Sequence, residues 1–159
     1  MMKKFMILVV SVMIFMACDY ATESLELKPD IEITWLDPVA WYIYPYDTTY
    51  SAQIAEIHFV AENSIDSYLS EFFIEYYTNA DSLVFTTAPV PVYGKIEGIV
   101  QAGCCDTFIL YNIVVPLAPA YQYLGPNESM QTLLHFVAVD EYFENTDTAE
   151  VWFGIWMLP

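Results

Sequence analysis

The sequence contains no arginine, and few other cations offset its acidic residues. Four lysines and two histidines stand against 21 aspartates and glutamates in 159 residues, which gives a formal net charge of −17. The phosphates of a nucleic acid repel a chain of this charge, so nucleic acid is excluded as a partner. A basic patch that binds anionic lipid is excluded for the same reason, and any association with a membrane needs another device.

Cysteine is equally scarce. Apart from Cys18, it occurs only as the adjacent pair Cys104 and Cys105. This spacing matches neither a zinc site nor a CxxC redox motif. We expect two small, partly buried residues in a glycine-containing turn, and a vicinal disulfide or an intermolecular bridge remains the alternative.

Sequence motifs of enzymes are missing as well. There is no GxSxG nucleophile motif and no glycine-rich phosphate loop. The two histidines, His58 and His135, fall in the middle of separate predicted strands, on the outward face, without the spacing of metal ligands. Among 21 carboxylates, a pair at the separation used by glycosidases would arise by chance. We therefore predict that the protein is not an enzyme.

The N-terminus carries the clearest signal that is present. Two lysines and a thirteen-residue apolar run, broken by a single serine, lead to Ala17 and Cys18. A positive start, a short apolar run and a small residue at the junction are typical of a secretory signal. The run is too short for the ~20 apolar residues of a membrane-spanning helix.

The segment Phe15-Met16-Ala17-Cys18 resembles the lipobox of bacterial lipoproteins. The resemblance implies a signal peptide over residues 1–17 and a lipid on Cys18 that anchors the exported protein to a membrane of the bacterial cell envelope. Ordinary secretion is the alternative, and the sequence does not distinguish the inner from the outer membrane. Residues 18–30 lack a clear period and are predicted to be a lipidated tether.

From Ile31 to residue 159 the hydrophobic pattern has a period of two, which is typical of β-strands. Since 57% of the whole sequence is apolar, this part is expected to be one folded domain rather than a disordered acidic segment. We predict strands at 31–35, 52–61, 68–78, 83–86, 95–100, 108–117, 133–140 and 149–158, and an edge strand or structured loop at 41–50. The predicted core residues include Trp35, the alternating set Ala55, Ile57, Phe59 and Ala61, the set Phe72, Ile74 and Tyr76, the set Ile109, Tyr111, Ile113 and Val115, and the set Val151, Phe153, Ile155 and Met157.

These strands, with no helix to cover a parallel sheet, predict an all-β fold, a single antiparallel sandwich of seven to eight strands, with a barrel as the alternative. The residues 134–141 (LHFVAVDE), Asn145 and the segment 149–151 look like the last two strands of bacterial immunoglobulin-like and fibronectin type III-like modules. That resemblance implies an immunoglobulin-like β-sandwich. It implies nothing about function, because this fold carries many unrelated roles.

Two groups of residues are candidate sites. The first is an acidic loop after the penultimate strand, whose hard oxygen ligands are those that calcium requires, although a solvated turn has the same composition. The second is an aromatic segment that could bind a protein or glycan partner, because tyrosine and tryptophan provide contact area at a low entropic cost. Three of its tyrosines have the same parity and would share one face of an extended segment. The calcium candidates are Asp140, Glu141, Glu144, Asn145 and Asp147, and the aromatic candidates are Trp41, Tyr42, Tyr44 and Tyr46.

Together these features predict a lipid-anchored cell-envelope protein with a non-catalytic domain of the binding or adhesion type. A structural accessory subunit of an envelope assembly is one alternative. A carbohydrate-binding or calcium-binding module is another. Calcium is the only cofactor that the sequence brings forward.

Overall fold

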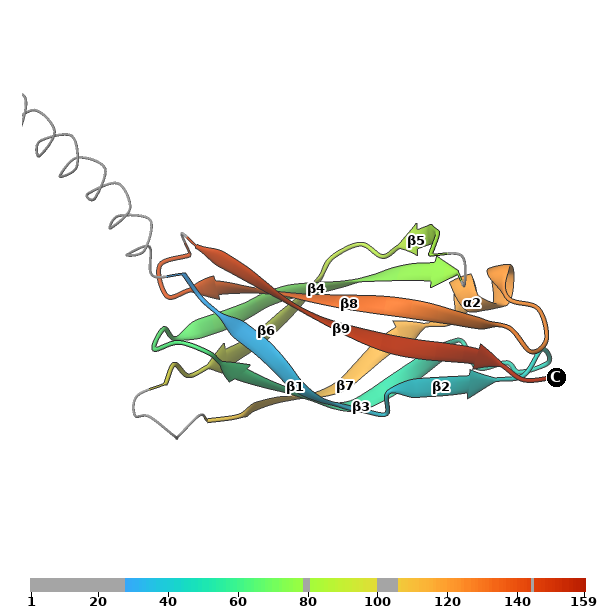
Figure 1. Ribbon diagram of the computed structural model, residues 1–159, viewed down its shortest axis with the longest axis horizontal. Helices are drawn as coiled ribbons and strands as arrows, with labels where there is room; N and C mark the ends of the chain where they lie inside the picture. Colours follow the sequence, from blue (N-terminus) through green and yellow to red (C-terminus); the bar gives the residue numbers. More distant parts are fainter. Residues whose placement is uncertain (1–27, 79–80, 100–105, 144) are drawn as a thin grey trace, which may run out of the picture.

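The computed structural model describes residues 28–78, 81–99, 106–143 and 145–159, which fold into an all-β domain of two packed sheets (Figure 1). The described chain begins at one end of an elongated sandwich, where β1 starts, and the C-terminus lies at the opposite end. These residues contain nine strands, one more than the upper number predicted, and a short helix. The elements are β1 (Ile31–Asp37), β2 (Ala40–Ile43), β3 (Ser51–Ala61), β4 (Ser67–Thr78), β5 (Leu83–Thr86), β6 (Val90–Ile96), β7 (Phe108–Pro116), α2 (Ala118–Tyr123), β8 (Ser129–Asp140) and β9 (Thr146–Met157).

The strands form a three-stranded and a six-stranded sheet. The smaller sheet has the order β1-β3-β7, and the larger has the order β2-β9-β8-β4-β5, with β6 also paired to β4. The long ladders β4–β8 and β8–β9 are antiparallel and each joins eleven residue pairs. β4, β8 and β9 therefore form the extensively paired centre of the larger sheet.

The core lies between the two sheets. Phe59 of β3 meets Phe136 of β8 edge-on, with ring centroids 5.1 Å apart. The Tyr76 hydroxyl on β4 donates a hydrogen bond of 2.8 Å to the carbonyl of Pro116 at the end of β7, and so links the two sheets. Full burial of an apolar side chain such as that of Phe59 or Phe136 contributes about 1.5–3 kcal/mol to the stability of the fold. The core positions predicted on β4 (Phe72, Ile74, Tyr76) are confirmed as buried, as are Phe153, Ile155 and Met157 on β9.

The prediction that all strands pair antiparallel is wrong at one edge. β2 runs parallel to β9, with Ala40 opposite Gly154 and Ile43 opposite Met157. Only residues 38 and 39 separate β1 from β2. This short link carries the chain from the smaller sheet to the larger one without reversing it, and β2 therefore runs parallel to β9.

Two connections contain more regular structure than predicted. No strand was predicted at residues 87–94, but strand β6 covers Val90–Ile96, and the strand predicted at 95–100 ends at Ile96 within the described residues. β6 pairs only with β4 in the described chain, which is the kind of edge position that tolerates Pro91. The connection after β7 holds α2, with a proline in its first turn.

Several residues of the smaller sheet face the opposite way from the prediction. On β7, Ile113 and Val115 are buried as expected, but Tyr111 is 55% exposed because Asn112 between them has a φ of 61° and interrupts the alternation. On β3, the strand paired with β7 in the same sheet, the alternation also shifts, so that Ile54 is buried and Ala55 is exposed. On β1 a register shift lies between Ile33 and Trp35, and Trp35, predicted to be in the core, is 57% exposed.

Candidate functional site

The predicted aromatic segment does not form one face. Trp41 packs partly buried against the core, and Tyr42 points outward from β2. Beyond Ile43 the chain turns: the Asp47 amide donates to the carbonyl of Tyr44 at 3.0 Å, and the Asp47 carboxylate accepts the Tyr44 amide at 3.2 Å. Tyr44 and Tyr46 therefore lie in a turn, and the prediction of a shared extended face is wrong, although Tyr46 is 95% exposed.

Tyr42 instead belongs to a row of aromatic residues on the outer face of the six-stranded sheet, the face turned away from the core. Its partner in the β2–β9 register is Trp156. A Cβ atom at Gly154 would lie only 3.2 Å from the indole nitrogen of Trp156. The indole therefore lies over the strand at Gly154, where the missing side chain leaves space for it.

The row continues along β9 and on to β4. Trp152 lies on the same face as Trp156, four residues earlier, which is about 13 Å along a strand. Its ring meets that of Tyr77 with centroids 5.5 Å apart and an angle of 63°. We call Tyr42, Tyr77, Trp152 and Trp156 the aromatic face.

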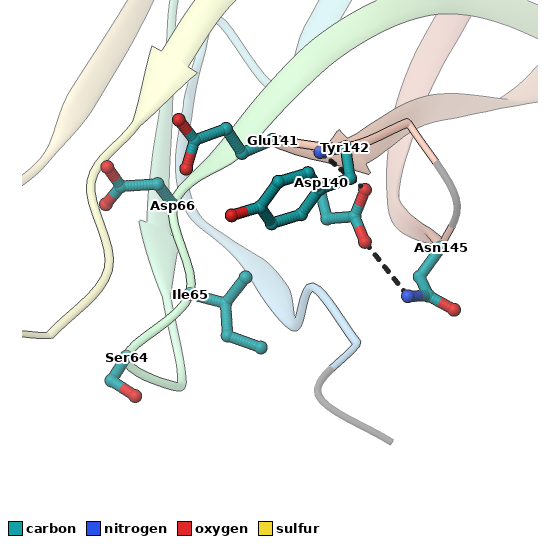
Figure 2. Close-up of a pocket in the computed structure, with 7 residues that line it drawn as sticks. All are labelled: Ser64, Ile65, Asp66, Asp140, Glu141, Tyr142 and Asn145. Carbon is teal, nitrogen blue, oxygen red and sulfur yellow. Dashed lines mark hydrogen bonds between the residues drawn. The ribbon is translucent and has the colours of Figure 1, made fainter.

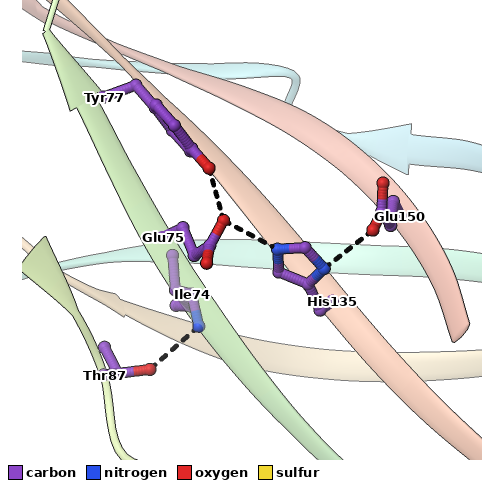
Figure 3. Close-up of polar contacts among 6 residues, drawn as sticks. All are labelled: Ile74, Glu75, Tyr77, Thr87, His135 and Glu150. Atoms are coloured by element: carbon purple, nitrogen blue, oxygen red, sulfur yellow. Dashed lines mark hydrogen bonds and ion pairs between the residues drawn. The ribbon is translucent and has the colours of Figure 1, made fainter. Parts of the chain in front are cut away.

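A polar network borders the aromatic face (Figure 3). The ring of His135 lies between two carboxylates, with Nε2 3.2 Å from Glu75 and Nδ1 2.9 Å from Glu150. Phe73 stacks on this ring at 4.4 Å and 11°, and only 11% of the His135 side chain is exposed. Only a doubly protonated imidazole can donate a hydrogen bond to both carboxylates.

The same network perturbs two pKa values. The Tyr77 hydroxyl donates to Glu75, and this bond, with a smaller contribution from His135, holds the pKa of Glu75 below its ordinary value. The pKa of Tyr77 is raised, chiefly by the same hydrogen bond. Tyr77 thus joins the aromatic face to the charged groups, and the surface offers flat apolar rings beside fixed hydrogen-bonding groups.

The alternation along β9 contains a signal for the outward orientation of the two tryptophans. Trp152 and Trp156 alternate with Phe153, Ile155 and Met157, which were correctly assigned to the core. Large aromatic residues at the opposite parity had to point to solvent. The prediction singled out Tyr42 but neither of these tryptophans.

Among the described residues of the acidic loop, one carboxylate is buried. Asp140 is 5% exposed, and its oxygens accept hydrogen bonds from the Tyr142 amide at 3.1 Å and the Asn145 side chain at 2.9 Å. Asp147 accepts the Ile31 amide at 2.8 Å, and Glu141 is exposed. In the part of the chain that the structure describes, no three acidic, histidine or cysteine residues converge as a metal site would require. Glu144 lies outside the described residues.

A cavity of about 550 Å³ lies beside this loop (Figure 2). Ser64, Ile65 and Asp66 of the β3–β4 turn line one side, and Tyr142 and Glu141 line the other. Asp66 is paired with Lys95 at 2.6 Å and accepts the Gly98 amide at 2.9 Å. The Lys95 ammonium group holds the pKa of Asp66 below its ordinary value.

The remaining predicted positions are dispersed or not described. His58 on β3 and His135 on β8 lie in different sheets and do not form a pair. Cys18, Cys104 and Cys105 lie outside the described residues. Within the described ranges, no helix is long and apolar enough to cross a membrane.

Comparison with known proteins does not assign a family. The sequence matches no protein-family model, and comparison with curated protein sequences gave no match.

Proposed function

We propose that this protein is a non-catalytic binding module of the bacterial cell envelope, anchored through a lipid on Cys18 after removal of residues 1–17, and that its ligand is a neutral glycan chain. The observation that carries the proposal is the aromatic face. In this proposal the sandwich is immunoglobulin-like, as the sequence of its last hairpin suggests.

The chemistry of the aromatic face favours a sugar. Indole and phenol rings present flat apolar surfaces against which the C–H groups of a pyranose ring pack, and they lose little entropy on binding. Trp156 lies over its own strand with 44% of its surface exposed, and Trp152 is 52% exposed. Glu75 and Glu150 beside the rings can accept hydrogen bonds from sugar hydroxyls.

The negative charge beside the aromatic face further restricts the class of glycan that can bind. The two carboxylates border the rings in a chain with a net charge of −17, so uronic acids and phosphorylated sugars are disfavoured. A neutral glycan avoids this repulsion. The aromatic face lies over β2, β9, β8 and β4 rather than in an enclosed active site, and is therefore suited to binding a glycan chain rather than to cleaving it.

Affinity electrophoresis through gels containing neutral polysaccharides tests the ligand. Cellulose, chitin and xylan derivatives serve as probes for the mature protein. We expect retardation by at least one of them, and about a tenfold weaker affinity in Trp156→Ala, because one ring contributes about 1.4 kcal/mol.

Trp35→Ala is the matched control. Trp35 is as exposed as Trp152 but lies on β1 in the other sheet. Retardation should persist in this variant. Absence of retardation by every neutral probe, or an equal loss in both variants, would refute the glycan proposal.

Protease treatment of intact cells, with an immunoblot of native protein and Cys18→Ala, tests the anchor separately. We expect the native protein to remain with the membrane fraction and the variant to be released. If the variant is anchored and sized like the native protein, Cys18 is not the lipid attachment site.

A further inference from the structure

One end of the sandwich, which we call the tether pole, holds the start of the described chain and the β3–β4 and β8–β9 turns (Figure 1). The side chain of Asn63 donates to the carbonyl of Lys28 at 2.7 Å, and the amide of Glu62 donates to the carbonyl of Asp30 at 2.8 Å. Asp147, just after the second turn, accepts the amide of Ile31. These bonds fix the point at which the chain enters the domain.

Two adjacent aromatic side chains are exposed at this pole. Tyr142 is 77% exposed and Phe143 is 73% exposed. The Phe143 amide donates to the carbonyl of Asp140 at 3.1 Å, and the buried Asp140 carboxylate accepts the Tyr142 amide. The turn that presents the two rings is therefore internally bonded. Phe143 also has a φ of 59°, a left-handed conformation that disfavours a bulky side chain.

We propose that Tyr142 and Phe143 insert into the interfacial layer of a zwitterionic lipid bilayer, the membrane that carries the lipid anchor. Tyrosine and phenylalanine rings favour the boundary between headgroups and acyl chains. This inference rests on the proposed lipid at Cys18 and adds a second contact between the protein and the same membrane.

The length of chain outside the described residues brings the tether pole to the bilayer. Ten residue steps separate Cys18 from Lys28, and even a fully extended chain covers at most ~36 Å over that distance. The twelve-residue strand β9 is about 40 Å long, so the far end of the domain is farther from the bilayer than the tether alone can reach. The pole that bears Tyr142 and Phe143 is therefore the part of the domain closest to the lipid.

The negative charge of the tether pole favours zwitterionic over anionic lipid headgroups. Three acidic residues gather at the chain entry: the Glu62 amide donates to the carbonyl of Asp30, and Glu32 lies on β1 opposite Val60 of β3. Glu32, and to a smaller extent Asp30, raises the pKa of Glu62. Anionic headgroups would be repelled there. Beside Tyr142, the exposed carboxylate of Glu141 lines the cavity and offers an acidic group to the ammonium groups of zwitterionic headgroups.

Hydroxyl-radical footprinting of the vesicle-bound protein tests the contact without altering either ring. The mature chain from residue 18, with Cys104→Ser and Cys105→Ser, is coupled through Cys18 to a myristoyl chain and bound to phosphatidylcholine vesicles. We expect oxidation of Tyr142 and Phe143 to fall about fivefold relative to the uncoupled protein, because the rings leave water. Tyr46, near the far end and 95% exposed, is the internal control and should be oxidised at the same rate in both states.

A flotation assay provides the second measurement. A single acyl chain binds membranes only reversibly, so an additional contact should be visible as a larger bound fraction. We expect the double variant Tyr142→Ser, Phe143→Ser to bind about tenfold more weakly than the native sequence, and Tyr44→Ser, Tyr46→Ser to bind like it. Vesicles of phosphatidylglycerol should give little protection of the two rings.

Unchanged oxidation of Tyr142 and Phe143 on phosphatidylcholine vesicles would overturn the proposal, as would equal membrane affinity of the two double variants. Equal protection on phosphatidylglycerol would overturn the choice of a zwitterionic surface. Because the acyl chain is attached chemically, a negative result here leaves the lipidation of Cys18 untouched, and the Cys18→Ala experiment on cells decides that question alone.

Discussion

Removal of one buried hydroxyl, in Tyr76→Phe, tests how the two sheets are held together. Tyr76 is fully buried, and its hydroxyl donates to the carbonyl of Pro116 in the opposite sheet. Phenylalanine keeps the ring, including its contact with Phe85 at 5.7 Å, and leaves the Pro116 carbonyl without this donor. A buried acceptor that loses its donor costs about 1–3 kcal/mol, so we expect the free energy of unfolding at neutral pH to fall by about that amount.

The same variant should behave differently in alkali. Burial raises the pKa of Tyr76 well above its ordinary value of about 10. Above pH 10 the unfolded chain releases this proton and the folded chain keeps it, so the native protein loses stability by about 1.4 kcal/mol per pH unit through this group. Tyr76→Phe lacks the group. Its deficit relative to the native protein should therefore shrink by about 1.4 kcal/mol between pH 9 and pH 11.

Urea unfolding monitored by tryptophan fluorescence at pH 7, 9, 10 and 11 measures both effects. The other twelve tyrosines are common to the two proteins, so their titration cancels in the difference. A deficit that stays constant from pH 7 to pH 11 would show that Tyr76 does not resist ionisation in the fold. No deficit at pH 7 would show that the hydrogen bond to Pro116 does not stabilise the contact between the sheets.

Three other substitutions test local features. Gly94→Ala places a Cβ inside van der Waals contact with the Phe108 ring, so we expect about 1–3 kcal/mol of destabilisation in urea, and an unchanged midpoint would contradict this packing. Lys95→Met removes the ammonium group that lowers the pKa of Asp66; the native protein should be slightly more stable above about pH 4, and this advantage should disappear as the pH falls through the lowered pKa of Asp66. A melting-temperature difference that is independent of pH would argue against the ion pair. Asp140→Ala removes the acceptor at the centre of the β8–β9 turn and should cost about 1–3 kcal/mol in thermal unfolding, whereas an unaltered melting temperature would show that the turn does not need it.

The alternation of apolar residues predicted those parts of the fold in which the strands are regular. On β4 and β9 the period of two runs without interruption across the core positions, and Phe72, Ile74, Phe153 and Ile155 are buried as expected. In such strands a residue's parity determines its face. The same rule, applied to the other parity of β9, would have placed Trp152 on the aromatic face.

The pattern could not predict the places where the backbone departs from a flat strand. A left-handed residue such as Asn112, or the register shift before Trp35, breaks the alternation, so that residues on its two sides no longer share a face as their parity predicts. Neither is visible in a binary pattern. The turn at Tyr44 is held by hydrogen bonds to Asp47 that depend on local geometry. Strand pairing depends on contacts distant in the sequence, and the parallel β2–β9 pair could not be derived from local periodicity.

The crossing of the first segment from one sheet to the other also determines how the domain bears mechanical load. A pulling force between the start of the described chain and the C-terminus acts along the strands, because these two points lie at opposite ends of the sandwich (Figure 1). β1 is held by its ladder with β3, and β2 by its ladder with β9, before the chain reaches the rest of the fold. Hydrogen bonds that lie across the direction of the force are sheared together rather than opened one after another. We therefore expect the segment 31–43, which is paired in both sheets, to resist such a force.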